Sequence, residues 1–356
     1  MPNNNNSNTP PRDEDDEYYI CPECGYDSTD EADFTYSPYF GYAVCTSCYE
    51  DGEAARRDEE HDEDEENDIQ PYSTRHRARF HYDDGKVSLY QPMDESLARP
   101  MLTMGYELEV EYEGHRTYSK YDGAAHVLDN FGRGDEHIYL KSDGSLNDGF
   151  EIVTQPGTLK YYQEHFDWEP IQGLAKMGFK AWNNSHCGLH IHMSRNAFVN
   201  DRHLFLYIKF IYGNRDGLVQ FAGRESHYAK FGMDEFLNAW YDYDTNRRVR
   251  ASKLIDIVKG RQLNNDRYVA VNLQNTATIE LRFFRPSLKA STVRAALEFC
   301  DASFRYVHQL SLPEVLQNNG LAWNSFRSWL NSKNDPSYAT LRERLVERCG
   351  ALNSDE

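Results

Sequence analysis

The feature that most constrains the fold is the stretch Gly105–Tyr112, in which apolar and acidic side chains alternate strictly. Successive side chains of a β-strand point to opposite faces, so one face would carry Leu108, Val110 and Tyr112. The other face would carry three carboxylates, those of Glu107, Glu109 and Glu111. Carboxylates two residues apart lie roughly 7 Å from each other along a strand, and like charges that close repel unless a cation lies between them. Alone, this pattern is typical of a strand with a solvated outer face.

The same alternation recurs in three later stretches. Glu151 lies opposite in phase to the apolar residues of Gly149–Thr154. One face of Cys187–Ser194 would carry His190, His192 and Ser194, and one face of Thr278–Phe283 would carry Glu280 and Arg282. If the strands share a sheet, these polar faces form one acidic surface with histidines and an arginine, the side chains that bind metal ions and phosphate. We therefore predict a mainly antiparallel sheet with helices on its apolar face and the site on its open face.

These motifs, in this order, resemble the amidoligase family. The shared pattern consists of GYELE at 105–109, DGSL at 143–146, FEIV at 150–153, CGLHIH at 187–192, DRYVAVNL at 266–273 and IELR at 279–282. The family belongs to the carboxylate–amine ligases, together with glutamine synthetase and gamma-glutamylcysteine ligase. The resemblance covers roughly residues 104–299. It implies an α+β, glutamine synthetase-like fold, in which a curved, mainly antiparallel sheet is backed by helices.

The resemblance also implies a reaction, in which ATP converts a carboxylate into an acyl phosphate that an amine then attacks. Mg²⁺ would neutralise the phosphates. Glu109 and Glu151 would bind one ion. Glu107, His190 and Glu280 would bind the ion that bridges the phosphates. By the resemblance, His192 would contact a phosphate or a ligand water. Arg282 would stabilise the transferring phosphoryl group.

Further residues are expected to bind the substrates. By the resemblance, Asp143 and Ser145 would bind substrate or deprotonate the amine, whereas an ordinary Asp-Gly turn is the alternative. Arg267 and Asn272 would contact nucleotide or substrate. Arg224 could reach a substrate carboxylate or phosphate, or it could be a surface arginine. The substrates would be ATP, a carboxylate and an amine, either of which a peptide or protein could carry, and ligases of this superfamily often form homo-oligomers.

Two Cys-x-x-Cys pairs near the N-terminus predict a zinc site with the ligands Cys21, Cys24, Cys45 and Cys48. Tetrahedral Zn²⁺ takes four thiolates, and each pair supplies two of them. A redox dithiol would not explain two matched pairs. Since all four ligands come from the protein, we expect a structural zinc. The six aromatic side chains between the pairs would fill the small core or form a docking face for a protein partner.

Composition divides the chain into four parts. We expect a disordered tail at 1–17, the zinc-binding module at 18–50, an acidic linker or exposed acidic helix at 51–70 and the catalytic domain at 71–356. The net charge of −20 argues against binding to nucleic acid or an anionic membrane. No apolar run approaches the ~20 residues of a membrane span, and the Asn-rich N-terminus does not resemble a secretory signal. We therefore expect a cytoplasmic protein.

Two other functions fit the same residues. A metallohydrolase could use His190, His192 and the carboxylates to bind Zn²⁺ or Mn²⁺ and activate water, although the other histidines lack ligand spacing. A non-enzymatic adaptor could bind partners through the zinc module and keep the ligase-like body as a scaffold. The joint presence of all the expected ligands and Arg282 argues against that second alternative.

Overall fold

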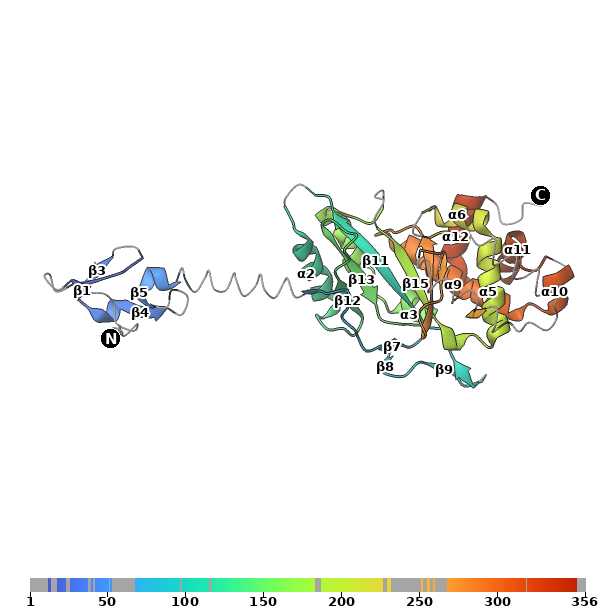
Figure 1. Cartoon of the computed structure of the whole chain (residues 1–356), viewed down its shortest axis with the longest axis horizontal. Coiled ribbons are helices and arrows are strands. Elements are labelled where there is room, and N and C mark those ends of the chain that lie inside the picture. Colours follow the sequence, from blue (N-terminus) through green and yellow to red (C-terminus); the bar gives the residue numbers. More distant parts are fainter. Residues whose placement is uncertain are drawn as a thin grey trace. The chain divides into compact units, whose positions relative to one another are not determined.

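The computed structural model describes residues 12–13, 18–23, 26–37, 40, 42–50, 52, 68–96, 98–114, 117–182, 187–226, 229–231, 251, 255–256, 259, 268–317 and 319–350. The chain divides into two compact units, Met1–Asp68 and Ile69–Glu356. Figure 1 shows the elements of each unit. None of the described helices combines the length and the hydrophobicity that crossing a membrane requires.

The first unit contains short strands, a short 3-10 helix and helical residues at 46–50. Three of the strands form one antiparallel sheet, β1 (Arg12–Asp13), β2 (Tyr18–Ile20) and β3 (Asp27–Ser28). After the short 3-10 helix η1 (Glu31–Asp33), β4 (Phe34–Ser37) pairs with β5 (Tyr42–Cys45). The buried hydrophobic cluster of the described part is small and consists of Cys21, Phe34, Ala43, Val44 and Cys45. Because so small a core stabilises little, a unit of this size needs a further source of stability, such as a metal or a disulfide.

The second unit is built on a sheet with the strand order β16-β17-β15-β11-β13-β12-β6, and β14 also pairs with β11. In that order the bounds are Val271–Asn272, Thr278–Phe284, Leu189–Ser194, Met104–Tyr112, Gly149–Thr154, Ile138–Lys141 and Ile69–Gln70, and β14 is Phe179–Lys180. All neighbouring pairs are antiparallel except β12 with β6. The prediction of an α+β fold with a mainly antiparallel sheet is confirmed.

One face of the sheet packs into the main core. Leu108, Val110, Ile152, Ile191 and Leu281 are completely buried there. The same core includes apolar side chains from the helices α2 (Lys120–Phe131), α3 (Leu159–Glu164), α4 (Glu169–Gly173), α5 (Asp201–Gly213), α6 (Arg215–Ala222), α9 (Ala290–Gln309), α11 (Trp323–Lys333) and α12 (Ala339–Cys349). In Figure 1, α2 lies beside β12 and β13, and α9 lies beside α5 and α12. Burial of this face leaves the polar face for the site.

The sequence also predicts a helix capped by Thr158, helices over 201–221 and 234–258, one capped by Ser291 that ends near residue 309, and two or three more over 312–349. Several of these boundaries differ in the structure. Thr158 caps a helix as expected, since its Oγ1 accepts a hydrogen bond from the N–H of Tyr161 at 3.2 Å. The helix expected from there to about residue 177 is instead α3, α4 and the 3-10 helix η2 (Leu174–Met177), because Pro170 sits in the first turn of α4 and starts a new helix. The helix expected over 201–221 is interrupted by Asn214, which lies between α5 and α6.

The predicted cap Ser291 is wrong, because α9 begins one residue earlier, at Ala290. After α9, the chain adds α10 (Leu312–Gln317), α11, the 3-10 helix η4 (Pro336–Tyr338) and α12. These elements agree with the two or three helices expected over residues 312–349. The helix expected over 234–258 falls mainly outside the described residues.

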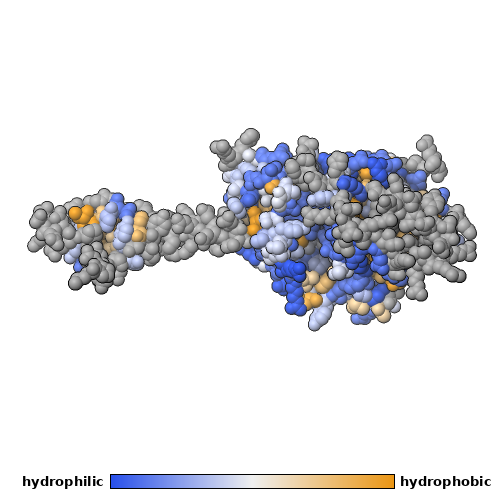
Figure 2. All heavy atoms as spheres, in the orientation of Figure 1, coloured by the Kyte–Doolittle hydropathy of each residue, from blue (hydrophilic) through white to orange (hydrophobic). Residues whose placement is uncertain are grey.

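The segment that precedes β11 forms short hairpins beside the sheet, with β7 (Phe80–His81), β8 (Val87–Ser88), β9 (Met93–Asp94) and β10 (Arg99–Pro100). It is fixed to the end of β13. The N–H of His81 donates to the carbonyl of Pro156 at 2.9 Å, and the N–H of Arg79 donates to Gln155 at 3.0 Å. On the face seen in Figure 2, hydrophilic side chains predominate among the described residues of this unit, with small separate hydrophobic patches.

Candidate active site

The sheet register brings the predicted site residues together. Glu107 on β11 lies opposite His190 on β15, and Glu109 lies opposite Glu151 on β13. His192 lies opposite Glu280 on β17. Since residues directly opposite in an antiparallel pair share a face, the polar residues of four strands gather on the face away from the core.

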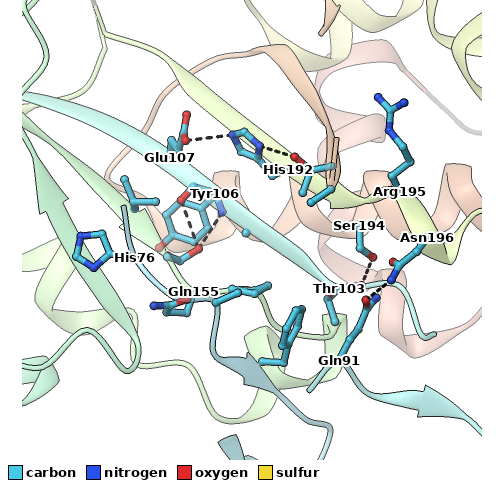
Figure 3. Close-up of a pocket in the computed structure, with 18 of the residues that line it drawn as sticks. His76, Gln91, Thr103, Tyr106, Glu107, Gln155, His192, Ser194, Arg195 and Asn196 are labelled. Carbon is cyan, nitrogen blue, oxygen red and sulfur yellow. Dashed lines mark hydrogen bonds and ion pairs between the residues drawn. The ribbon is translucent and has the colours of Figure 1, made fainter. Parts of the chain in front are cut away.

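Glu107 is the centre of this cluster. Its two carboxylate oxygens lie 3.4 Å from Nδ1 of His190 and 3.1 Å from Nε2 of His192, and Figure 3 shows the second contact. Burial alone would raise the pKa of Glu107, but the charge of His192 and the hydrogen bond with His190 outweigh it and hold that pKa well below its usual value. Burial lowers the pKa of His192, but Glu107 outweighs it and raises that pKa to about 9. The two residues therefore stabilise each other's charged forms.

Glu280 is also held by several partners. The Arg282 guanidinium forms an ion pair with it, and the amide of Asn272 donates a hydrogen bond to its Oε2 at 2.8 Å. Nδ1 of His190 lies 3.5 Å from its Oε1. Burial raises the pKa of Glu280, but His192 and His190 outweigh burial and lower it. A fixed, ionised carboxylate of this kind is suited to bind a cation.

Glu109 and Glu151 are buried carboxylates whose cationic neighbours do not offset the effect of burial. Burial raises the pKa of both groups, and nearby carboxylates raise it further, among them Asp143 in each case. For Glu151 the charges of Glu107 and Glu109 add to the shift. Nearby carboxylates that destabilise each other in this way are relieved when a divalent cation binds between them.

Two sets of side chains on this face are close enough to hold a metal ion. One consists of Glu107, His192 and Glu280, and the other of Glu107, Glu151 and His190, each with ligand atoms within 4.8 Å of one another. Glu107 belongs to both. The grouping differs from the expected one, because His192 joins a possible ligand set and Glu109 belongs to neither set of the described residues. The expected pairing of Glu109 with Glu151 stays a prediction.

The remaining predicted residues lie around this cluster. Asp143 is close enough to Glu109 and Glu151 to affect their pKa values, and it accepts a hydrogen bond from the backbone of the exposed Ser145 at 2.7 Å. Arg224 approaches Glu109, since a Cβ atom at Gly188 would lie 3.2 Å from both side chains. Burial lowers the pKa of Arg224, and Glu109 opposes that shift. Arg267 lies outside the described residues.

A cavity of about 600 Å³ borders the cluster at Glu107 and His192. Its other walls come from the segment before β11, the end of β13 and the residues that follow β15: His76, Ala78, Phe80, Gln91, Gln155, Pro156, Arg195 and Asn196. Figure 3 labels the polar side chains among them, those of His76, Gln91, Gln155, Arg195 and Asn196. Several buried polar atoms of the described lining lack a hydrogen-bond partner, among them Nε2 of His76 and Oγ1 of Thr103. The sequence motifs did not indicate these residues, because they lie in irregular segments without alternation.

In the first unit, Cys21, Cys45 and Cys48 come together, with their sulfur atoms within 4.8 Å of one another. The N–H of Cys45 also points to the sulfur of Cys21 at 3.4 Å. Cys24, the fourth predicted ligand, lies outside the described residues. Three converging thiols from both Cys-x-x-Cys pairs are suited to a soft metal ion such as Zn²⁺.

Comparison with known families gives a match over part of the chain. Residues 130–304, just under half of the chain, match the family model described as "Putative amidoligase enzyme", so this segment is similar to the amidoligase family. The matched segment contains β13, β15 and β17, whereas β11 lies before it. No curated protein matches the chain.

Among solved structures, one titled "Crystal structure of novel glutamine synthase homolog" is similar to this chain. The match has 11% sequence identity and a TM-score of 0.34, and it covers 70% of this chain. The chain spans 65% of the length of that structure.

Proposed function

We propose that the protein is an ATP-dependent carboxylate–amine ligase, which forms an amide bond through an acyl phosphate at a Mg–ATP site. The observation that carries this proposal is Glu107, which belongs to both possible metal-binding sets and also borders the cavity of about 600 Å³. A nucleotide in that cavity would direct its phosphates toward two carboxylate–histidine sets. The match of residues 130–304 to the amidoligase family model supports amide formation as the outcome.

The donor atoms fit Mg²⁺ or Mn²⁺. Each set offers two carboxylates and one imidazole, and carboxylate oxygens are the hard ligands that these ions prefer. Burial and neighbouring carboxylates raise the pKa of the buried Glu151, and a cation bound there would offset both effects. Bound ions would neutralise the charge on the transferring phosphoryl group.

The cavity suits a nucleotide. Its volume lies in the range of small-molecule sites, and ligand pockets combine apolar walls with a few convergent polar groups. Ala78, Phe80 and Pro156 supply apolar surface, while Gln91 and Asn196 supply hydrogen-bonding amides. The unpartnered Nε2 of His76 and Oγ1 of Thr103 are buried polar atoms that a bound ligand or water would satisfy.

The proposed reaction has two steps. An oxygen of the substrate carboxylate attacks the γ-phosphorus of ATP, and ADP leaves; the amine nitrogen then attacks the acyl carbon, phosphate leaves, and the amine loses a proton. Arg282 would stabilise the charge on the phosphoryl oxygens through its guanidinium fork. Asp143, which lies near Glu109 and Glu151, would take the proton of the amine. Arg224 would orient the substrate carboxylate.

Other parts of the site have supporting roles in this proposal. Asn272 would hold Glu280 in place, and Ser145 would fix the turn that carries Asp143. Arg267 stays a proposed nucleotide contact. In the first unit, Cys21, Cys24, Cys45 and Cys48 would bind one structural zinc. We also propose the division into tail, zinc-binding module, acidic linker and catalytic domain that the composition suggests.

The ligand chemistry favours a ligase over a zinc hydrolase. Catalytic zinc sites commonly use two or three histidines or cysteines, whereas each set here has one histidine and two carboxylates. A hydrolase would release phosphate or cleave its substrate without an amine. The ligase requires both a carboxylate and an amine for turnover.

The test is release of phosphate from ATP with Mg²⁺ and a panel of acids and amines, with the metal removed by EDTA as a control. Glu280→Ala should abolish turnover, because it removes a ligand that one metal-binding set needs. Arg282→Lys keeps the charge but loses the bidentate fork, so we expect a loss of roughly 10²–10³-fold. Glu111→Gln, on the same polar face of the sheet, is the matched control and should keep its turnover. The variant retains the side-chain oxygen that accepts the N–H of Asn147 at 2.8 Å.

Thermal melts should show that all of these variants stay folded, because the altered side chains lie on the polar face. Full turnover of both Glu280→Ala and Arg282→Lys on an identified substrate would show that the site assignment is wrong. Turnover without any amine would support the hydrolase.

A further inference from the structure

Four arginines lie near one another beyond the ends of α6 and β17, away from the cavity. They are Arg224 after α6, Arg285 after β17, and Arg344 and Arg348 on α12. The cavity borders Gly105 and Glu107 on β11, whereas Arg224 approaches Glu109, further along the same strand. We call these four residues the arginine cluster.

Contacts between neighbouring elements assemble the arginine cluster. A Cβ atom at Gly223 would collide with the guanidinium of Arg348, whose Cζ would lie 3.0 Å away, so Arg348 covers the residue next to Arg224. Arg285 and Arg344 line the same small pocket, and the charges of Arg348 and Arg285 both act on Arg344. Arg224 is the member of the cluster that approaches Glu109.

The arginine cluster has few anionic partners among the residues that the structure describes. Among the described residues, Arg224, Arg285 and Arg348 form no ion pair, and Arg344 has one distant partner, Glu347 at 3.9 Å, whose side chain is 70% exposed. Arg344 and Arg348 are four residues apart on one helix, a spacing at which like charges destabilise the helix. Burial and the neighbouring arginines lower the pKa of Arg344. A chain with a net charge of −20 has ample carboxylates to neutralise these groups, yet within the described part of the chain only Glu347 forms an ion pair with a member of the cluster.

The partners that the guanidinium groups do have leave donors for a ligand. Arg224 donates to the backbone carbonyl of Phe284 at 3.3 Å, and Arg348 donates to that of Gln220 at 3.2 Å. Arg285 lies over the ring of Trp182, 5.1 Å from its centre, and this tryptophan is 47% exposed. An arginine stacked on an exposed aromatic ring offers both charge and apolar surface to a bound chain.

We propose that the arginine cluster binds an acidic peptide segment, which carries the carboxylate that the enzyme activates. This inference rests on the proposed ligase function. A peptide with several carboxylates would place one of them at Arg224 beside the metal-binding residues and others at Arg285, Arg344 and Arg348. Trp182 would contact its aliphatic atoms. Carboxylates are favoured over phosphates as the bound groups because the proposed reaction begins with a carboxylate.

The test measures binding of a fluorescein-labelled oligoglutamate peptide to the full chain by fluorescence anisotropy, with oligoglutamine as the neutral comparison. The wild-type protein should bind oligoglutamate in preference to oligoglutamine, with an affinity that falls as salt increases. The double variant Arg344→Gln/Arg348→Gln should bind about tenfold more weakly for each arginine lost. Its melting temperature should stay the same or rise, since the change removes repulsion between like charges.

Arg342→Gln is the matched control on the same helix. Arg342 donates to the backbone carbonyl of Asp335 at 2.7 Å and is not part of the cluster, so its replacement should leave peptide binding unchanged. Equal affinity of the double variant and the wild type would overturn the proposal, as would equal binding of oligoglutamate and a single-stranded oligonucleotide. Binding of Mg–ATP, measured separately on the same variants, distinguishes failure of this inference from failure of the proposed ligase function.

Discussion

Buried histidines of the second unit make its stability sensitive to acid. His203 is 4% exposed; its Nε2 donates to the carbonyl of Phe304 at 3.0 Å, and its Nδ1 accepts the N–H of Val199 at 3.4 Å. Protonation of Nδ1 would therefore replace this hydrogen bond by two donors that face each other. Burial lowers the pKa of His203 to about 4. Burial also lowers the pKa of His81 to about 4.

The sign of the effect follows from proton linkage. The folded pKa lies below the unfolded one, so the unfolded chain binds more protons between about pH 4 and 6.5, and stability falls as the pH falls through that window. For His203 the loss is on the order of 3 kcal/mol. Urea unfolding followed by tryptophan fluorescence reports on the second unit, which holds all five tryptophans.

His203→Gln should keep both hydrogen bonds and reduce this dependence on pH, whereas His81 would still contribute its share. If the free energy of unfolding falls between about pH 7 and pH 4.5 by the same amount in His203→Gln as in the wild type, His203 does not titrate in this way.

At the scale of elements, the beginning of β15 controls the spacing of the site. A Cβ atom at Gly188 would lie 2.6 Å from Nε2 of His190 and 3.2 Å from both Arg224 and Glu109. Only a glycine lets the chain pass this close to the three side chains. The site therefore depends on a position that carries no functional group.

Gly188→Ala should displace His190 and weaken binding of Mn²⁺, measured by electron paramagnetic resonance, by about tenfold or more, the range reported for changes that disturb the surroundings of metal ligands. Gly213→Ala is the matched control, because nothing lies within 4 Å of the added atom. Both variants should melt cooperatively. Wild-type affinity for Mn²⁺ in Gly188→Ala would show that His190 is not held by this packing.

Alternation predicted the strands well, because a two-residue period is a direct consequence of strand geometry. Leu108 and Ile191 are buried and Glu107 and His190 share a face, as the pattern indicated. The sequence did not predict which side chains would share one metal ion. That grouping depends on side-chain directions and on the register of four strands, which local sequence does not specify. The walls of the cavity were missed for the same reason: His76 and Arg195 meet the sheet through contacts distant in sequence.

At the scale of the whole molecule, the two units are expected to fold independently. The first has a very small core with three converging cysteines among its described residues, whereas the second has one extensive core. Structural zinc supplies folding free energy to small modules of this kind. Loss of the metal should therefore affect only the first unit.

Cys45→Ser should release about one zinc ion per chain and expose the first unit to limited proteolysis. The thermal melt of the second unit, followed by tryptophan fluorescence, should not change. Elemental analysis by mass spectrometry that finds no zinc in the wild-type protein would refute the zinc assignment. A lowered melt of the second unit in Cys45→Ser would refute the independence of the units.

The central claim is that Glu107 and its neighbours form a metal-dependent nucleotide site. Isothermal titration calorimetry of the full chain with ATP, in the presence of Mg²⁺ or of EDTA, tests it most directly. We predict binding of about one ATP per chain with Mg²⁺, much weaker binding with EDTA, and loss of the metal-dependent part in Glu107→Gln. No binding of ATP, or binding that is equal with Mg²⁺, with EDTA and in Glu107→Gln, would contradict the claim.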